Sequence, residues 1–412
     1  MRNWQLCSAC FALCFASTMN AGAGDWPQIL GPNRNGIAVG EKLPGSISSK
    51  SLKPAWSFKA GMGLAGVAVQ GQTVVLFHRR GDDEIVSSLN AATGKPQWEQ
   101  RFPASFQPSI IPDDGPRCVP VISGQTVIVL GAAGTLAAMS FESGEKLWEH
   151  DLQKEYQSPT GYFGFGTTPL VDGDHVIVNV GGERSGAGVV AFDLKTGKEQ
   201  WKMGRELGSY SAPAMATIAG KSTALVITRL NFLGLDPATG EERFRTPFGA
   251  RGPTVNGATP VVNGDRVLLT ASYGIGAKLL QVTPTSTKTL WESEILSSQY
   301  TTPIWQDGAV YGIDGRQDGG PISLKCFDPL TQKVHWETPD LPYATLIAAD
   351  GKLLIFGTDG SLRVAKLQTS KYEELGRARV GTSTTRGLPA LSNARIYVRD
   401  EEALHAWNWT TE

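Results

Sequence analysis

The feature that most constrains this chain is a short pattern that returns every 39 to 53 residues. In its clearest copy, an alternating apolar strand from Val189 leads to a turn with Asp193 and Gly197, and the next strand carries Trp201. The Asp carboxylate can accept turn N–H groups, glycine supplies a positive φ, and the aromatic residue anchors the unit. The anchors are Trp56, Trp98, Trp148, Trp201, Phe244, Trp291, Trp336 and Leu375. Eight anchors predict eight units.

A second marker, a proline, has the same period. The prolines are Pro120, Pro169, Pro213, Pro260, Pro303 and Pro389, and the double gap before the last one indicates a unit without it. Proline is tolerated at the start of a strand or on a free edge, which predicts the innermost strand of each unit. Each unit has room for four short strands joined by hairpin turns such as Asn263-Gly264. No unit has a long helical period, which argues against a helical solenoid.

The two ends of the repeat region complement each other. The last unit, 388–409, has only three strands, whereas residues 54–58 form an isolated anchor strand. Pairing them would complete the last unit and remove exposed edges. The sequence therefore predicts an all-β fold, an eight-bladed β-propeller of four-stranded antiparallel blades that is closed by an N-terminal strand joining the C-terminal blade.

Composition and the N-terminus limit the class of protein. The chain has 412 residues, a net charge of −1 and 41% hydrophobic residues, which excludes a disordered chain or a strongly basic nucleic-acid-binding protein. Residues 1–23 have the basic start, apolar stretch and small residues of a signal peptide, and the stretch is too short for a permanent membrane span. We expect a signal peptide over 1–23, an N-terminal extended arm over 24–53 and the propeller domain over 54–412, in an exported protein that is periplasmic or extracellular.

The five cysteines bear on lipidation and on disulfide formation. Cys7, Cys10 and Cys14 lie in the signal region without a convincing lipidation box, so a lipoprotein is the less favoured reading. Cys118 and Cys326 would remain in the mature chain, in different blades, and do not indicate a disulfide framework.

The repeat resembles a known family. Its Ala-x-Asp-x-x-Thr-Gly-x-x-x-Trp signature, here Ala191, Asp193, Thr196, Gly197 and Trp201, is similar to that of the PQQ-like, quinoprotein-type β-propeller repeats, over about residues 54–409. The opening residues 25–34 look like the N-terminal segment of exported PQQ-like repeat proteins of planctomycete-type bacteria. A WD-type propeller is disfavoured because its Gly-His and Trp-Asp marks are missing.

The resemblance implies two functional branches. One comprises quinoprotein dehydrogenases, which hold PQQ and calcium and generally carry adjacent cysteines. The other comprises non-catalytic scaffolds such as the propeller lipoprotein of the outer-membrane barrel-assembly machinery. This chain lacks a Cys-Cys pair and is nearer the scaffold's length. We therefore predict no cofactor and no metal, favour a protein without catalytic activity, and keep a PQQ- or other quinone-dependent oxidoreductase with an atypical site as the alternative.

A binding site is expected where the long loops gather. In a four-stranded blade, the loop that leads into the first strand and the loop between the second and third strands open on one face, and here these loops are the long ones. The predicted ligand-binding residues at the channel mouth are Arg117, Tyr162, Arg184, Tyr210, Arg251, Tyr300, Arg316 and Arg386. Arginine with aromatic residues suits a carboxylate, phosphate, sugar or extended peptide. The alternative is that each residue only packs or solvates its own loop.

Other chemistries have less support. The five histidines lack metal-ligand spacing, and His175 and His405 are expected to be structural. The charged hairpin at 79–84 is expected to be solvated. A carbohydrate-active site would need two inward carboxylates near the channel, for which Asp113, Asp114 and Glu183 are the loop candidates. We therefore predict a monomeric binding or scaffold protein of the bacterial cell envelope, engaging an envelope polypeptide or glycan through the long-loop face or by adding a strand to a blade edge, and not nucleic acid.

Overall fold

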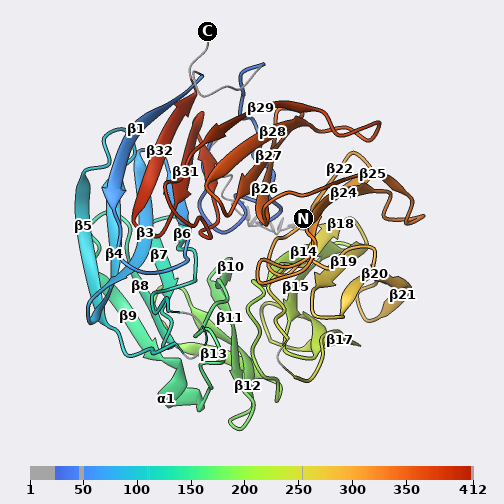
Figure 1. The fold of residues 1–412 in the computed structure, drawn as a ribbon. Coiled ribbons are helices and arrows are strands. Elements are labelled where there is room, and N and C mark those ends of the chain that lie inside the picture. The colour runs from blue at the N-terminus through green and yellow to red at the C-terminus, as the bar shows by residue number, and fades with distance from the viewer. Residues whose placement is uncertain (1–23, 46–50, 109, 111, 253, 410–412) are drawn as a thin grey trace, which may run out of the picture.

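The chain forms a closed ring of eight four-stranded antiparallel sheets, the blades of a β-propeller (Figure 1). This computed structural model describes residues 24–45, 51–108, 110, 112–252 and 254–409, so the expected signal peptide lies outside the described residues. The predicted fold class is confirmed. None of the helices in the described part of the chain has the length and apolar character of a membrane span.

Blades 1 to 7 each use four consecutive strands. Blade 1 contains β2 (Val67–Gln70), β3 (Thr73–Arg80), β4 (Asp83–Asn90) and β5 (Pro96–Pro103), and blade 2 contains β6 (Val121–Ser123), β7 (Thr126–Leu130), β8 (Thr135–Ser140) and β9 (Lys146–Asp151). Blade 3 contains β10 (Leu170–Asp172), β11 (His175–Gly182), β12 (Ala187–Asp193) and β13 (Glu199–Met203), and blade 4 contains β14 (Ala214–Ile218), β15 (Lys221–Ile227), β16 (Asn231–Leu235) and β17 (Glu242–Pro247). Blade 5 contains β18 (Val261–Asn263), β19 (Arg266–Ala271), β20 (Gly276–Val282) and β21 (Thr287–Ser293). Blade 6 contains β22 (Ile304–Gln306), β23 (Ala309–Asp314), β24 (Ser323–Phe327) and β25 (Val334–Pro339). Blade 7 contains β26 (Ala344–Ala349), β27 (Lys352–Gly357), β28 (Ser361–Lys366) and β29 (Glu374–Arg379). A short helix, α1 (Leu152–Tyr156), follows β9.

Blade 8 joins the two ends of the repeat region, as predicted. It contains β30 (Ala390–Ser392), β31 (Arg395–Arg399), β32 (Ala403–Trp409) and, as its outermost strand, β1 (Leu52–Lys59). The register of β1 on β32 places Trp56 opposite Ala406 and Ser57 opposite His405. This pairing covers the edge of β32 and closes the ring where the two ends of the repeat region meet.

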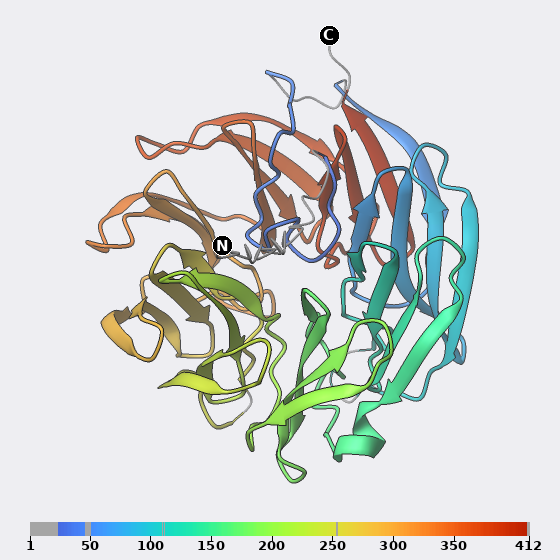
Figure 2. The same ribbon diagram turned by 180° about the vertical axis from the view of Figure 1, so that it is seen from behind.

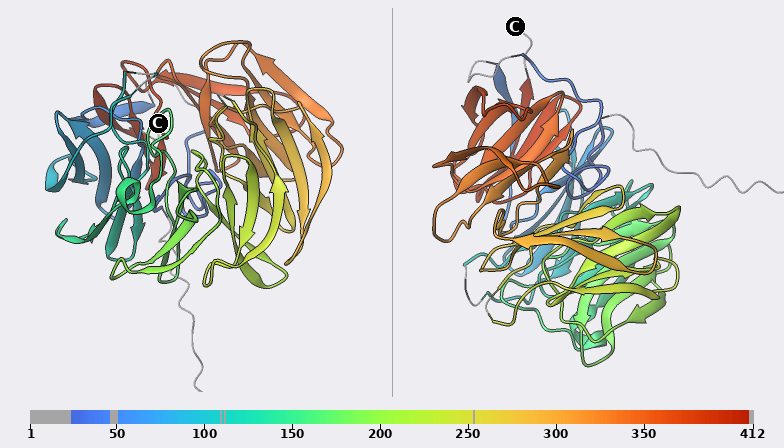
Figure 3. Two further views of the ribbon diagram at one scale, coloured as in Figure 1. Left: turned by 90° about the horizontal axis from the view of Figure 1, so that it is seen from below. Right: turned by 90° about the vertical axis from the view of Figure 1, so that its right-hand side faces the viewer.

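The core lies between neighbouring blades. The two middle strands of a blade are buried on both faces, as in β11 and β12, because each face packs against an adjacent blade. The outermost strands alternate between buried and exposed residues, as β13 does. This arrangement explains why middle strands have continuous apolar runs and outer strands have a period of two. Figure 3 shows the blades side by side from the edge of the ring.

The predicted prolines stand directly before first strands. Pro120 precedes β6, Pro169 precedes β10, and the pattern continues around the ring except in blades 1 and 7. In blade 7 this position is Tyr343, whose hydroxyl accepts hydrogen bonds from the backbone N–H groups of Tyr300 (2.9 Å) and Thr301 (3.1 Å). Blade 7, one of the two blades without this proline, thus has a side chain that ties it to blade 6.

Residues 24–45, here called the channel segment, cross the inside of the ring (Figure 2). Trp26 pairs with Val69 of blade 1, and Gly36 and Ala38 exchange backbone hydrogen bonds with Ala348 of blade 7. On the same side, the Glu41 carboxylate accepts the backbone N–H groups of Asn393 (2.6 Å) and Ala394 (2.8 Å) in blade 8. These contacts lie near the turns that join the first and second strands of the blades. The segment therefore covers the channel on the face opposite the long loops, here called the tight-turn face.

Arg34 extends from the channel segment deeper into the ring. Its guanidinium donates to the carbonyl oxygens of Pro213 (2.8 Å) and Pro169, at the starts of β14 and β10. Its Nε–H donates to the side-chain oxygen of Gln28 (2.7 Å). Burial lowers the pKa of Arg34 to about 9, which still leaves it charged at neutral pH. One arginine therefore joins two blades from the centre of the ring.

Candidate binding site

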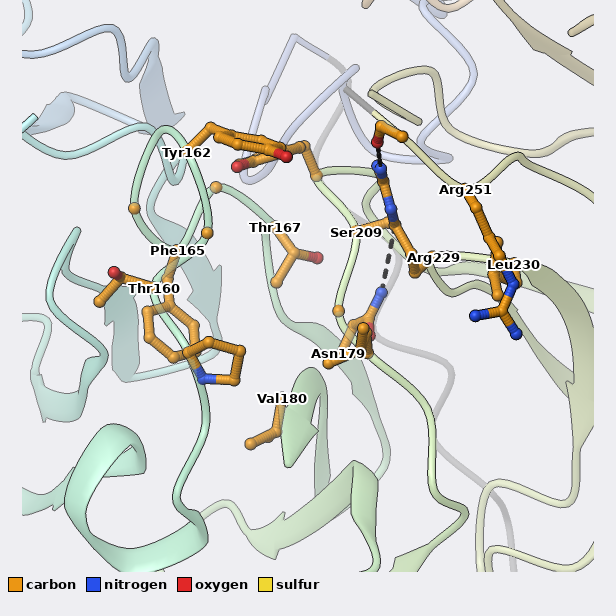
Figure 4. Close-up of a pocket in the computed structure, with 18 residues that line it drawn as sticks. Thr160, Tyr162, Phe165, Thr167, Asn179, Val180, Ser209, Arg229, Leu230 and Arg251 are labelled. Atoms are coloured by element: carbon orange, nitrogen blue, oxygen red, sulfur yellow. Dashed lines mark hydrogen bonds between the residues drawn. The ribbon is translucent and has the colours of Figure 1, made fainter. Parts of the chain in front are cut away.

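A cavity of about 410 Å³ opens on the long-loop face between blades 3 and 4 (Figure 4). Its walls come from residues 159–167, which lead into blade 3, from Asn179 and Val180 within β11, and from residues 207–210, which lead into blade 4. Arg229 and Leu230 of the loop between β15 and β16, and Arg251 and Gly252 of the following blade connection, complete it. The site is therefore built by the loop types that the sequence analysis assigned to binding.

One part of the cavity is apolar. Phe165 and Val180 are buried at 6% and 2% exposure, whereas Leu207 and Tyr162 remain 37% and 42% exposed at its opening. The chain approaches closely here, because a Cβ on Gly166 would lie 2.6 Å from the ring of Tyr210. Glycine at position 166 thus lets Tyr210 pack against the loop that forms the opposite wall.

Most polar groups of the cavity already have partners within the protein. The guanidinium of Arg229 donates to the carbonyl oxygens of Gly252 and Thr254. The Thr167 hydroxyl donates to Ser211 O (2.9 Å), and the Tyr210 hydroxyl accepts the N–H of Phe163 (3.0 Å). These bonds fix the shape of the cavity and leave few groups free to bind a ligand.

Asn179 is the exception. It is 2% exposed, lies within β11 and is one of the residues that line the cavity. Its Nδ2 donates to Ile227 O (2.8 Å), which fixes the orientation of the amide, because a flipped amide would place oxygen against oxygen. The Oδ1 atom then has no hydrogen-bond partner. This oxygen is sealed from solvent, so a ligand in the open cavity does not reach it.

Arg251 supplies a charge at the rim. It is exposed, lines the cavity, and forms no ion pair with the carboxylates in the described part of the chain. An exposed guanidinium can bind a carboxylate with two parallel hydrogen bonds. The cavity thus combines an apolar wall with a cation at its rim.

The structure brings three of the predicted ligand-binding residues together at this cavity: Tyr162, Tyr210 and Arg251. The other five lie elsewhere on the long-loop face. Arg184 is exposed in the loop between β11 and β12, and Arg386 is half-buried before β30. This cavity therefore contains three of the eight predicted residues.

The remaining three are engaged by their own neighbourhoods. Arg117 donates to Asp113 O (2.6 Å) and pairs with the Asp113 carboxylate at 3.2 Å. Tyr300 donates its hydroxyl to Gln317 (2.8 Å), and burial raises its pKa. Arg316 lies 4.6 Å from the ring of Tyr273 and pairs with Asp318. These contacts correspond to the alternative in which each residue stabilises its own loop.

The charged hairpin at 79–84 is not solvated as expected. Its tip is exposed, but Arg79 and Glu84 are buried at 9% and 1% exposure because the loop before blade 2 folds over them. Arg79 donates to Phe106 O (2.7 Å) and pairs with Asp114. Glu84 accepts the N–H of Ala132 (2.8 Å), its second oxygen lacks a partner, and burial raises its pKa to about 7.

His405 has the structural role that the sequence analysis assigned to it. Its Nδ1 lies 2.8 Å from the Ser57 hydroxyl of β1, and its Nε2 lies 2.9 Å from the Asp400 carboxylate. Asp400 also accepts the backbone N–H groups of Thr382, Glu402 and Ala403, and these bonds hold its pKa well below its usual range despite burial. The side chains of Ser57, His405 and Asp400 thus connect the closing strand β1 to the rest of blade 8.

Both described cysteines, Cys118 and Cys326, are buried and free. Burial raises the pKa of both thiols, of Cys118 to about 12 and of Cys326 to about 11. They therefore act as small apolar residues in separate blades.

A comparison with family models identifies the repeat. The model for outer membrane protein assembly factor BamB, of the PQQ-like type, matches residues 45–161 and 82–338, more than half of the chain. The chain belongs to this family. The resemblance predicted from the blade signature is thus confirmed. A comparison with curated proteins found no significant match.

Solved structures with the same fold include a BamB and two dehydrogenases. BamB from Moraxella catarrhalis has a TM-score of 0.65 and 20% identity, over 87% of this chain and 99% of that one. A europium-containing methanol dehydrogenase has a TM-score of 0.65 and 13% identity, over 91% and 89% of the chains. The quinohemoprotein alcohol dehydrogenase from Comamonas testosteroni has a TM-score of 0.54 and 14% identity, over 96% and 82%. At these identities the likeness establishes the fold alone.

Proposed function

We propose that this protein is a non-catalytic scaffold of the bacterial cell envelope that binds a polypeptide at the cavity between blades 3 and 4. Membership of the BamB family supports an envelope assembly role. The export signal expected over residues 1–23 agrees with that location. The observation that carries the proposal is the cavity itself, with an apolar wall and the exposed Arg251 at its rim.

The oxidoreductase alternative has less support from the residues of this chain. A quinone with calcium needs oxygen ligands for the metal, and no cluster of three His, Cys, Asp or Glu residues able to hold a metal ion occurs among the described residues. Asp113 and Asp114, which face the region around blade 1, are paired with arginines. The residues present do not fit that group, and we derive no catalytic step from it.

A matched pair of surface leucines tests the proposed function. Leu207 is 37% exposed at the cavity, whereas Leu330 is 56% exposed in a turn of blade 6 on the tight-turn face. We expect envelope proteins that co-purify with the wild type and Leu330→Glu to be lost from Leu207→Glu, because a charge at the cavity opening would be buried on binding. Loss from Leu330→Glu alone, or identical partners for both variants, would contradict the proposal.

A further inference from the structure

A second concave site lies on the tight-turn face, between blades 1 and 2. This site, here called the blade 1–2 hollow, has a volume of about 300 Å³. Blade 1 and blade 2 each contribute three of its lining residues, which are Thr73, Gln97, Trp98, Gln125, Phe141 and Glu142. We propose that the blade 1–2 hollow binds an uncharged sugar ring of a glycan. The inference goes beyond the proposed function, because it adds a second class of ligand on the opposite face of the ring.

The repeat provides an internal comparison for this site, since neighbouring blade interfaces contain equivalent positions. The backbone N–H of Phe141 donates to Gln125 O (2.9 Å), and in the next interface the N–H of Leu194 donates to Asp174 O (2.8 Å). Leu194 and Asp174 therefore occupy, between blades 2 and 3, the places of Phe141 and Gln125.

Two aromatic side chains form the apolar part of the hollow. Trp98 and Phe141 are half-buried, whereas their equivalents Trp148 and Leu194 are buried at 8% exposure each. The indole of Trp98 is fixed, because its Nε1–H donates to Phe141 O (3.0 Å) and Gly144 lies against its ring. A fixed aromatic surface suits a sugar, since the C–H groups on one face of a sugar ring pack against aromatic carbon.

Three exposed polar side chains, Gln97, Gln125 and Glu142, line the hollow beside the aromatic surface. Gln97 accepts at its side-chain oxygen from Thr73 (3.4 Å) and Ser88 (3.1 Å), which leaves its Nε2–H groups free. The side chains of Gln125 and Glu142 have no hydrogen-bond or ion-pair partner in the described part of the chain. Free donors and acceptors beside carbon surface match the hydroxyl groups around a sugar ring.

The neighbouring interface has lost this combination. Leu147 there takes the place of Gln97, in the residue before the anchor tryptophan. Lys195 takes the place of Glu142 and pairs with Asp174 at 3.6 Å. The polar groups of the blade 1–2 hollow are therefore a departure from the repeat rather than a requirement of the blade interface.

Charge separates an uncharged sugar from other ligands. The described residues that line the hollow include the carboxylate of Glu142 but no Lys, Arg or His. A phosphate or an acidic sugar would thus meet a like charge and no cation. A purely apolar ligand would cover the two glutamine amides and the carboxylate without giving them partners. An uncharged sugar ring satisfies both the aromatic and the polar part of the hollow.

Saturation-transfer NMR titrations with the purified protein test the inference. The probes are cellohexaose, maltohexaose and chitohexaose as uncharged glycans, hexagalacturonate as an acidic glycan, and trilysine as a ligand for a carboxylate alone. We expect at least one uncharged hexasaccharide to bind saturably, with transfer to its ring C–H protons. Hexagalacturonate and trilysine should bind more weakly than that sugar.

A variant with the residues of the neighbouring interface assigns binding to the hollow. Gln97→Leu, Gln125→Asp and Glu142→Lys are combined, and all three positions are exposed, so the fold should be unaffected. We expect this variant to lose sugar binding. Glu142→Gln alone should weaken binding about fivefold, because a hydrogen bond to a charged group is stronger than one to a neutral group. Lys195→Ala, at the equivalent position of the next interface, is the matched control and should bind like the wild type.

Several outcomes would overturn this inference. They are failure of all three uncharged sugars to bind, tighter binding of hexagalacturonate or trilysine, and unchanged sugar binding by the triple variant. Loss of sugar binding in Leu207→Glu would also contradict it, because Leu207 lines the cavity on the opposite face. The capture of envelope proteins by Leu207→Glu tests the proposed function separately, so failure of one claim is distinguishable from failure of the other.

Discussion

The indole of Trp148 lies directly against Gly197 of the next blade, so a Cβ on Gly197 would come within 2.7 Å of the indole ring. The same indole donates its Nε1–H to the carbonyl oxygen of Leu194, in the same turn, at 3.0 Å. Trp201 is placed in the same way on Gly240 and Pro237 of blade 4. The glycine and the tryptophan of one repeat thus belong to two different blade interfaces, and the repeat pattern stabilises the ring rather than the single blade.

Alanine substitutions at two glycines of blade 3 test this relationship. Gly197 and Gly173 both have positive φ, of 71° and 57°, but a Cβ on Gly173 would meet nothing within 4 Å. We expect Gly173→Ala to destabilise the protein by about 1 kcal/mol, from backbone strain alone. Gly197→Ala should cost about 2–4 kcal/mol, because it also displaces Trp148. Thermal unfolding of both variants measures this, and equal midpoints would contradict the interface.

Arg34 is expected to hold the channel segment in place. Arg34→Gln would leave the buried carbonyl groups of Pro169 and Pro213 without their donor, for a loss of about 2–5 kcal/mol. Arg205→Gln is the control, because Arg205 is exposed. Limited proteolysis should cleave residues 24–45 faster in Arg34→Gln than in the wild type or the control. Equal cleavage rates would show that Arg34 does not secure this segment.

Glu84 should make stability depend on pH near neutrality. Burial raises its pKa in the folded protein to about 7, from 4.5 when exposed. Between these values the folded state binds a proton that the unfolded state lacks, so the stabilising contribution is complete below about pH 4.5 and is lost as the pH rises through 7. The loss should reach about 3 kcal/mol at pH 8.

Glu84→Gln removes this titration without changing the shape of the side chain. Urea unfolding at pH 5 and pH 8 should therefore show the variant gaining stability relative to the wild type as the pH rises. A constant difference between the two proteins across this range would mean that Glu84 is ionised in the folded state at both pH values.

The oxidoreductase alternative makes a separate prediction. A ligand selective for the folded state raises its stability in proportion to RT ln(1 + [L]/Kd). We expect PQQ and calcium to leave the thermal midpoint and the visible absorbance of the purified protein unchanged. A saturable rise in the midpoint together with a bound chromophore would favour the enzyme.

The periodic features of the sequence predicted the fold well, because every blade must make the same interface. The Trp and Pro positions, the four-stranded units and the pairing of Trp56 with the last blade all follow from repetition. The channel segment was expected only as an extended arm, because its contacts with six blades leave no periodic signal. The interface role of Gly197 was missed because the turn alone explained its presence.

The candidate site was predicted only in part. The long-loop face and the residues Tyr162, Tyr210 and Arg251 were identified, because loop length and residue type carry that information. The contribution of Asn179 and Val180 to the cavity wall was missed because residues in a buried strand give no sequence signal of a cavity. Glu84 was read as solvated because the contacts of Phe106 and Asp114 with Arg79, which cover the hairpin, are tertiary and give no local sequence signal.

Photo-crosslinking in cells tests most directly whether the cavity is the binding face. A photoreactive amino acid replaces Tyr162 at the cavity or, as the control, Lys195 in the tight turn of the same blade, and both positions are exposed. We predict protease-sensitive adducts from position 162 and none from position 195. Adducts from position 195 alone, or adducts at position 162 that consist of carbohydrate, would contradict a polypeptide-binding cavity between blades 3 and 4.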